Sequence, residues 1–136
     1  MMLTKAVDVN PYGRLLHIII TGNFSEDYPA INKKYKQNLD EDDNVLGMSQ
    51  MRGQHHMIVI NLGKHRSIFK GIEIECELAD TIAHEADHLC NQLFKSMGAT
   101  VDVNNDEPHA YLLGWVVQQI TRVYLKFKEK ENGKMV

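Results

Sequence analysis

Hydrophobic residues recur at the helical period over the longest stretch of this chain, from Leu78 to Met97. At the α-helical turn of about 100° per residue, they gather on one broad face. This face consists of Leu78, Ala79, Ile82, Ala83, Ala86, Leu89, Cys90, Leu93 and Met97. The opposite stripe is polar and consists of Asp80, His84, Asp87, His88 and Asn91. Gly98 follows, and glycine favours the left-handed conformation that ends many helices. The pattern predicts a long helix that buries one side and exposes histidines with carboxylates on the other.

A second long helix is predicted from Pro108 onward, because proline fits the first turn of a helix. Its apolar residues also fall on one face. They are Leu113, Val116, Val117, Ile120, Tyr124 and Phe127. The polar residues 99–106 connect the two helices, and the charged residues 126–136 are expected to fray.

Runs of β-branched and apolar residues predict the strands. The clearest are residues 13–21 and 55–62, and a weaker strand is predicted over 45–51. Residues 71–77 alternate with period two, which leaves open a strand or the start of the histidine helix. His17, inside the first of these strands, is expected to be a core or edge histidine rather than a metal ligand.

Three polar segments lie between these elements. Residues 27–39 carry apolar side chains at helical spacing, which predicts a helix on the sheet with Pro29 in its first turn. The acidic run 40–43 is expected to be a solvated loop, because the glycine and terminal glutamate of an EF-hand loop are missing. The basic segment 61–70 is also predicted to be a loop.

Composition narrows the class of protein. With 136 residues, 43% of them hydrophobic, residues 1–136 are expected to form one globular domain. A formal net charge of −3 gives no reason to expect nucleic acid or a membrane as partner. The two cysteines, Cys76 and Cys90, are predicted to be buried thiols rather than a disulfide. Reduced thiols and the lack of a signal-peptide pattern at the N-terminus predict a cytoplasmic protein.

The polar stripe of the histidine helix contains the motif H-E-x-x-H. His84 and His88 lie one turn apart, about 40° around the helix axis, so both imidazoles can bind one metal ion. Glu85 follows the first histidine and can reach a metal-bound water as general base. This pattern predicts a zinc site on one rigid element.

A catalytic zinc ion needs a third protein ligand and one open position for water. The continuation with a third histidine at position 94 is excluded, since the chain has Asn91 and Phe94. Glu107, directly before Pro108, is the expected third ligand from the second helix. His109 is the competing candidate, and an acidic residue favoured near a helix N-terminus is the structural alternative for Glu107.

Three further residues have possible roles beside the metal. Asp80 or Asp87 could accept a hydrogen bond from a ligating imidazole and fix its tautomer, or could simply be solvated. Tyr111, one turn after Glu107, could donate a hydrogen bond to a developing oxyanion. Core packing with an exposed hydroxyl is the alternative for Tyr111.

Taken together, these motifs resemble the minimal zincins, specifically the small gluzincin-like HExxH metallopeptidases encoded by phages and bacterial mobile elements. The resemblance covers HEADHLCNQL at 84–93 and EPHAYLLGWV at 107–116, with the strand HHMIVINL at 55–62 before them. It implies an α+β zincin-like fold, with a small twisted mixed sheet packed on the active-site helix and a C-terminal helix. It also implies His84, His88 and Glu107 as zinc ligands. Strand 55–62 would belong to the sheet, and its suggested place is the edge that binds extended peptide.

The hypothesis that follows is a zinc-dependent peptidase acting on a peptide or protein. The alternative is a non-catalytic zincin-like module that binds another protein. Nucleic-acid binding through residues 64–70 and the basic tail is not expected, because both patches are short.

Overall fold

The computed structural model describes residues 1–133, which contain four strands, four α-helices and one 3-10 helix. The strands are β1 (Met2–Val9), β2 (Arg14–Thr21), β3 (Gly47–Arg52) and β4 (His55–Asn61). The helices are α1 (Phe24–Tyr35), η1 (Glu41–Asp43), α2 (Leu62–Ile68), α3 (Ile72–Ser96) and α4 (Glu107–Gly133). The α+β fold class predicted from the sequence is confirmed.

The four strands form one mixed sheet in the order β1-β2-β4-β3. The central pair, β2 and β4, is parallel, and each outer strand pairs antiparallel with its neighbour. The apolar strand β4 is therefore central, and its suggested position at the edge of the sheet is wrong. Its residues 57–61 are all buried, as expected for a strand covered on both faces. The edge strand next to β4 is β3, and the opposite edge strand is β1.

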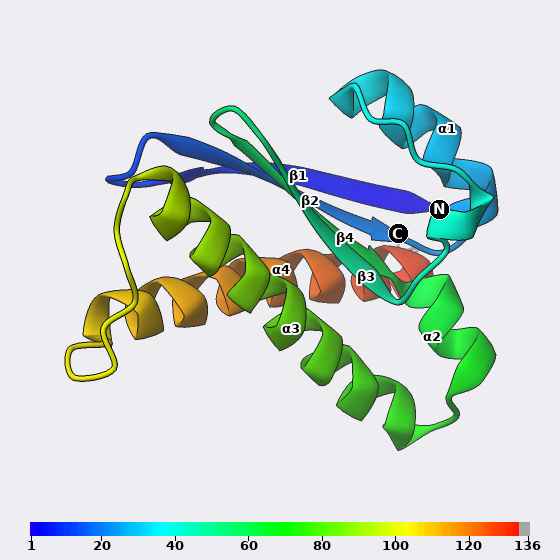
Figure 1. Cartoon of the computed structure of the whole chain (residues 1–136). Coiled ribbons are helices and arrows are strands. Elements are labelled where there is room, and N and C mark those ends of the chain that lie inside the picture. The colour runs from blue at the N-terminus through cyan, green and yellow to red at the C-terminus, as the bar shows by residue number, and fades with distance from the viewer. Residues whose placement is uncertain (134–136) are drawn as a thin grey trace.

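Alternation along the two central strands creates two cores. Helices α3 and α4 cover one face of the sheet and α1 covers the other (Figure 1). The larger core includes Leu16, Ile18, Ile20, Ile58 and Ile60 from the sheet. The smaller core under α1 includes Ile19, Met57 and Val59.

Several predicted boundaries are wrong. The segment 61–70 is not a loop, because its residues 62–68 form helix α2. The Asn61 side chain caps the N-terminus of this helix by accepting from the Lys64 N–H at 3.0 Å. Strand β1 was not anticipated. The ambiguous residues 71–77 belong to helix α3, whose N-cap, Gly71, has a φ of 57°. Helix α1 begins at Phe24, so Pro29 lies inside it rather than in its first turn.

The acidic run 40–43 also folds locally, as a 3-10 turn capped by the Asp40 side chain. Cys90 is buried as expected, whereas Cys76 is exposed, so the prediction of two buried thiols is half wrong. Both are free. None of the helices within residues 1–133 is long and apolar enough to span a bilayer.

The C-terminal helix α4 is ordered further than its charge pattern predicts. It continues to Gly133, and Phe127 in its last third is fully buried. The expected fraying of 126–136 is therefore wrong up to residue 133, and residues 134–136 lie outside the described part.

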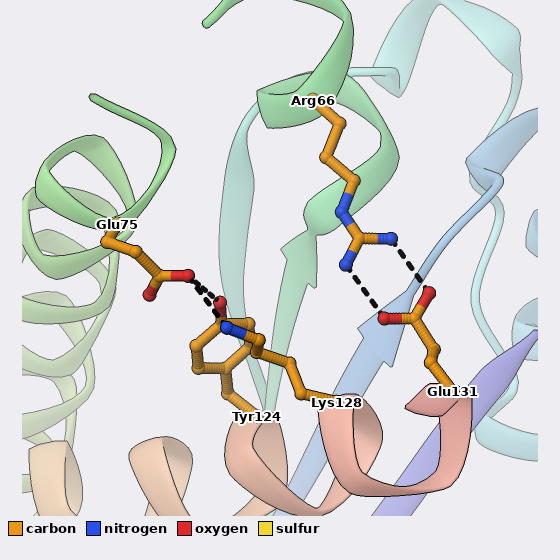
Figure 2. Close-up of polar contacts among 5 residues, drawn as sticks. All are labelled: Arg66, Glu75, Tyr124, Lys128 and Glu131. Carbon is orange, nitrogen blue, oxygen red and sulfur yellow. Dashed lines mark hydrogen bonds and ion pairs between the residues drawn. The ribbon is translucent and has the colours of Figure 1, made fainter. Parts of the chain in front are cut away.

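Polar contacts fasten this end of α4 to the two helices beside it (Figure 2). Arg66 of α2 donates two hydrogen bonds to the Glu131 carboxylate, at 2.8 and 2.7 Å. Glu75 of α3 accepts from the Tyr124 hydroxyl at 2.5 Å and from Lys128 at 3.1 Å.

Candidate metal centre

The two histidines of the motif converge on the exposed side of α3. Their Nε2 atoms are 3.1 Å apart, with the ring centroids at 4.6 Å and the ring planes at 84°. Two imidazoles bound to one tetrahedral zinc ion at about 2.0–2.1 Å would have nitrogen atoms about 3.3 Å apart. The pair therefore fits two ligands of one ion. At this distance one ring donates to the other in a single hydrogen bond, in a direction set by the tautomers.

Glu85 is placed differently from the histidines that flank it in the motif. Glu85 is only 6% exposed, and its side chain points from α3 toward the edge strand β3. A Cβ added to Gly47 of β3 would lie 3.1 Å from the Glu85 Cγ. Burial raises the pKa of the Glu85 carboxyl above its usual value, and the imidazoles of His84 and His88 oppose this shift.

A buried histidine on α2 supports this part of the helix. The His65 ring nitrogens lie 2.8 Å from the Asn61 carbonyl oxygen and 2.8 Å from the Thr81 hydroxyl. In the matching tautomer, Nδ1–H donates to Asn61 and Nε2 accepts from Thr81, one turn before Glu85. His65 was missed because residues 61–70 were predicted to be a loop. The signal available in the sequence was Asn61, a strong N-cap residue, directly after a strand.

Glu107 occupies the first position of α4 and is exposed. Within residues 1–133, no three His, Cys, Asp or Glu side chains are placed to hold one metal ion. The structure thus brings His84 and His88 together without gathering Glu107 to them. Its role as third ligand stays a prediction.

His109 meets α3 beside the histidine pair. Its Nε2 lies 3.2 Å from the Asn91 Oδ1 and 3.5 Å from an Asp87 carboxylate oxygen. Asn91 also donates to Asp87 at 3.2 Å. The Asp87 carboxylate therefore contacts Asn91 and His109, and no hydrogen bond joins it to His84 or His88 within residues 1–133.

Tyr111 is 75% exposed. Its alternative role, packing in the core, is therefore wrong, and its role as hydrogen-bond donor to an oxyanion stays a prediction.

The buried face of α3 is rotated about the helix axis relative to the predicted apolar face. Ala79 and Ala83 are exposed, whereas Thr81, Glu85 and Phe94 are buried.

Comparison with known proteins adds no assignment to this geometry. No protein-family model, no curated protein and no solved structure matches the chain. The resemblance to the zincins therefore depends on the motif residues, and any function has to be argued from the contacts described above.

Proposed function

We propose that this protein is a metal-dependent hydrolase, a zinc peptidase, with its centre at His84 and His88. The observation that supports it is the convergence of the two Nε2 atoms at 3.1 Å, directly beside a buried glutamate. His84 and His88 would hold the ion with Glu107 as third ligand, or His109 in its place. Either choice requires the N-terminal turn of α4 to contribute a ligand.

The chemistry of the site divides between the ion and the chain. A bound zinc ion supplies Lewis acidity and lowers the pKa of a water molecule toward neutrality. Glu85 takes a proton from water and passes it to the leaving amine. Its raised pKa suits this role, because a general base works best with a pKa near the working pH.

The edge strand β3 offers a place for an extended substrate. Within the described residues its only strand partner is β4, so its other edge has no strand beside it. A peptide can add to such an edge through main-chain hydrogen bonds. Glu85 packs against this strand at Gly47, which would bring the scissile bond of a peptide on β3 near the proposed base.

The test of catalysis is Glu85→Gln. We expect this variant to retain zinc, measured by elemental analysis, and to lose cleavage of a diverse peptide library by at least about a hundredfold. Glu73→Gln, an exposed position on the same helix, is the matched control and should cleave normally. Cleavage by Glu85→Gln at the wild-type rate would refute the catalytic assignment.

The ligand set is tested separately by zinc content. His84→Ala and His88→Ala should each abolish stoichiometric zinc binding. Of Glu107→Ala and His109→Ala, the variant that loses zinc identifies the third ligand. Full zinc content in both would show that neither completes the site.

A non-catalytic binding module is the second candidate, and one observation favours it. Large apolar side chains are exposed between residues 97 and 111. They are Met97 at 38%, Val101 at 43%, Val103 at 85% and Tyr111 at 75%. All four belong to the end of α3, the connection 97–106 and the start of α4, and a contiguous apolar patch on such a surface is typical of protein-binding sites. In the peptide-library experiment such a module would enrich peptides without cutting them, and Val103→Ser would reduce the enrichment.

A further inference from the structure

A cavity of about 580 Å³ lies on the other face of the sheet, beside the C-terminal end of α1. Its floor follows the strand register. Ala6, His17, Met57 and Gln50 lie side by side on the four neighbouring strands and all line the cavity. The volume is in the range of about 300–1,000 Å³ typical of small-molecule sites. Because α3 packs on the opposite face, this cavity is separate from the histidine motif.

Positive charge surrounds the cavity. Lys34, Lys36 and Arg52 line it, and no aspartate or glutamate is among its described lining residues. None of the three forms an ion pair within residues 1–133, where the ion pairs involve Arg66, His109 and Lys128.

The hydrogen-bond partners of two of these cations are neutral. The Lys34 ammonium donates to the Thr4 hydroxyl at 3.3 Å, and the Arg52 guanidinium donates to the Lys36 carbonyl at 2.8 Å. Within the part of the chain that the structure describes, no carboxylate pairs with either group. Three such cations around one cavity favour an anion.

Flat rings form one side of the same cavity. The rings of His17 and His55 lie nearly coplanar and edge to edge, with an interplanar angle of 13° and with the His17 Nε2 3.0 Å from the His55 Nδ1. The Tyr35 ring lies 5.1 Å from the His17 ring. The pKa of His17 is lowered by burial and by the charges of His55 and Lys34, as expected in a positive environment. Met57 and Ala6 add apolar floor.

We propose that this cavity binds a small organic anion with a flat aromatic body and one phosphate or carboxylate group. The rings and the apolar floor would hold the body, and Lys34, Lys36 and Arg52 would hold the acidic group. Guanidinium and ammonium groups bind such anions through charge-assisted hydrogen bonds. The proposal does not depend on metal binding at α3.

The probe for the test is 1-naphthyl phosphate, added to the full chain and followed by calorimetry. 1-Naphthol carries the same ring without the charge, and inorganic phosphate carries the charge without the ring. We expect 1-naphthyl phosphate to bind at least about tenfold more tightly than either. The ring resonances of His17 and His55 should shift on binding in NMR spectra, which locates the ligand.

Arg52→Gln and Lys34→Gln should each weaken binding of 1-naphthyl phosphate by about three- to tenfold. Arg122→Gln, an exposed arginine on α4 outside the cavity, is the matched control and should leave binding unchanged. The proposal would be overturned by no binding at millimolar probe, by equal binding of 1-naphthol, or by equal losses in Arg122→Gln. Thermal unfolding serves as the independent check that the variants fold, and Glu85→Gln should bind the probe normally.

Discussion

His56 is a fully buried histidine of β4 whose ring nitrogens have no hydrogen-bond partner within residues 1–133. Burial lowers the pKa of His56 to about 4, with smaller contributions from the charges of Arg14 and His55. An unfolded chain takes up this proton near its ordinary pKa of 6.5, whereas the folded chain takes it up only near 4. Folding is therefore opposed by protonation between these two pH values.

This predicts that the free energy of unfolding falls by about 2 kcal/mol on acidification from about pH 7 to pH 5, from His56 alone. His56→Leu should remove that part of the pH dependence, and it should cost little or even stabilise at neutral pH, because both unpaired nitrogens are removed. Urea unfolding of both proteins at the two pH values measures the difference. If the free energy of unfolding of His56→Leu depended on pH as strongly as that of the wild type, the assignment to His56 would be contradicted.

Gly47 shows how closely β3 and α3 approach at the candidate centre. A Cβ at this position would lie 2.7 Å from the Thr81 Cγ2 and 3.1 Å from the Glu85 Cγ. Gly47→Ala is predicted to destabilise the protein by about 1–3 kcal/mol through overpacking. It should also disturb the proposed base, because Glu85 has to shift.

Gly114→Ala is the matched control in α4, since its added Cβ would meet no atom within 4 Å. There, alanine should stabilise the helix by about 0.5–1 kcal/mol. Thermal unfolding of the two variants separates them. Equal effects at both positions would show that the close approach at Gly47 does not matter.

Among the elements, the contact of α3 with α4 through Glu75 and Tyr124 carries a testable pH dependence. The pKa of Glu75 is lowered, first by the Tyr124 hydrogen bond and then by Lys128, against the effect of burial. A lowered carboxyl pKa contributes stability above its ordinary value of 4.5, and that stability is lost as pH falls below it. Tyr124→Phe should therefore cost about 1 kcal/mol near pH 7 and less in acid.

The matched comparison is Arg66→Gln, which breaks the half-exposed ion pair with Glu131. Such surface pairs contribute about 0–1 kcal/mol, so this loss should be smaller and should shrink at high salt. Denaturant titration at two pH values and two salt concentrations distinguishes the two contacts. A Tyr124→Phe effect that stays constant down to strongly acidic pH would contradict the role of Glu75.

Helices with a long, regular spacing of apolar residues could be predicted from the sequence. A short helix whose start depends on one capping side chain could not. The helices around the histidine motif and after Pro108 have long apolar faces, so α3 and α4 were found from spacing. Helix α2 is short and basic, and its start depends on one Asn61 side chain. Strand β1 has a half-exposed pattern, because one edge strand needs little apolar surface.

The candidate site follows the same division. A single helix fixes the spacing of His84 and His88, so their convergence followed from sequence and was observed. The third ligand depends on how the polar connection 99–106 positions α4 against α3, and no local pattern specifies that path. His65 and the cavity beside α1 depend on contacts between distant segments, which periodicity does not report.

At the scale of the whole molecule, Gly22 lies beside both the first residue of the chain and the C-terminal helix α4. Gly22, just after β2, donates from its N–H to the Met1 carbonyl at 2.9 Å. A Cβ at Gly22 would also lie 3.3 Å from the Phe127 ring of α4. In Figure 1 the N-terminus and the end of α4 both lie toward the right-hand end of the sheet. The larger core thus extends from the first strand to the last helix.

This arrangement predicts that Phe127→Ala destabilises the entire protein by about 3–5 kcal/mol, because a fully buried aromatic side chain is removed. Leu125→Ala, at a position 56% exposed on the same helix, should change stability by less than about 1 kcal/mol. Hydrogen exchange decides between global and local effects. If Phe127 belongs to the common core, amides of β2 and α3 lose protection together with those of α4. Loss confined to the end of α4 would instead show that the charged C-terminal turns unfold on their own.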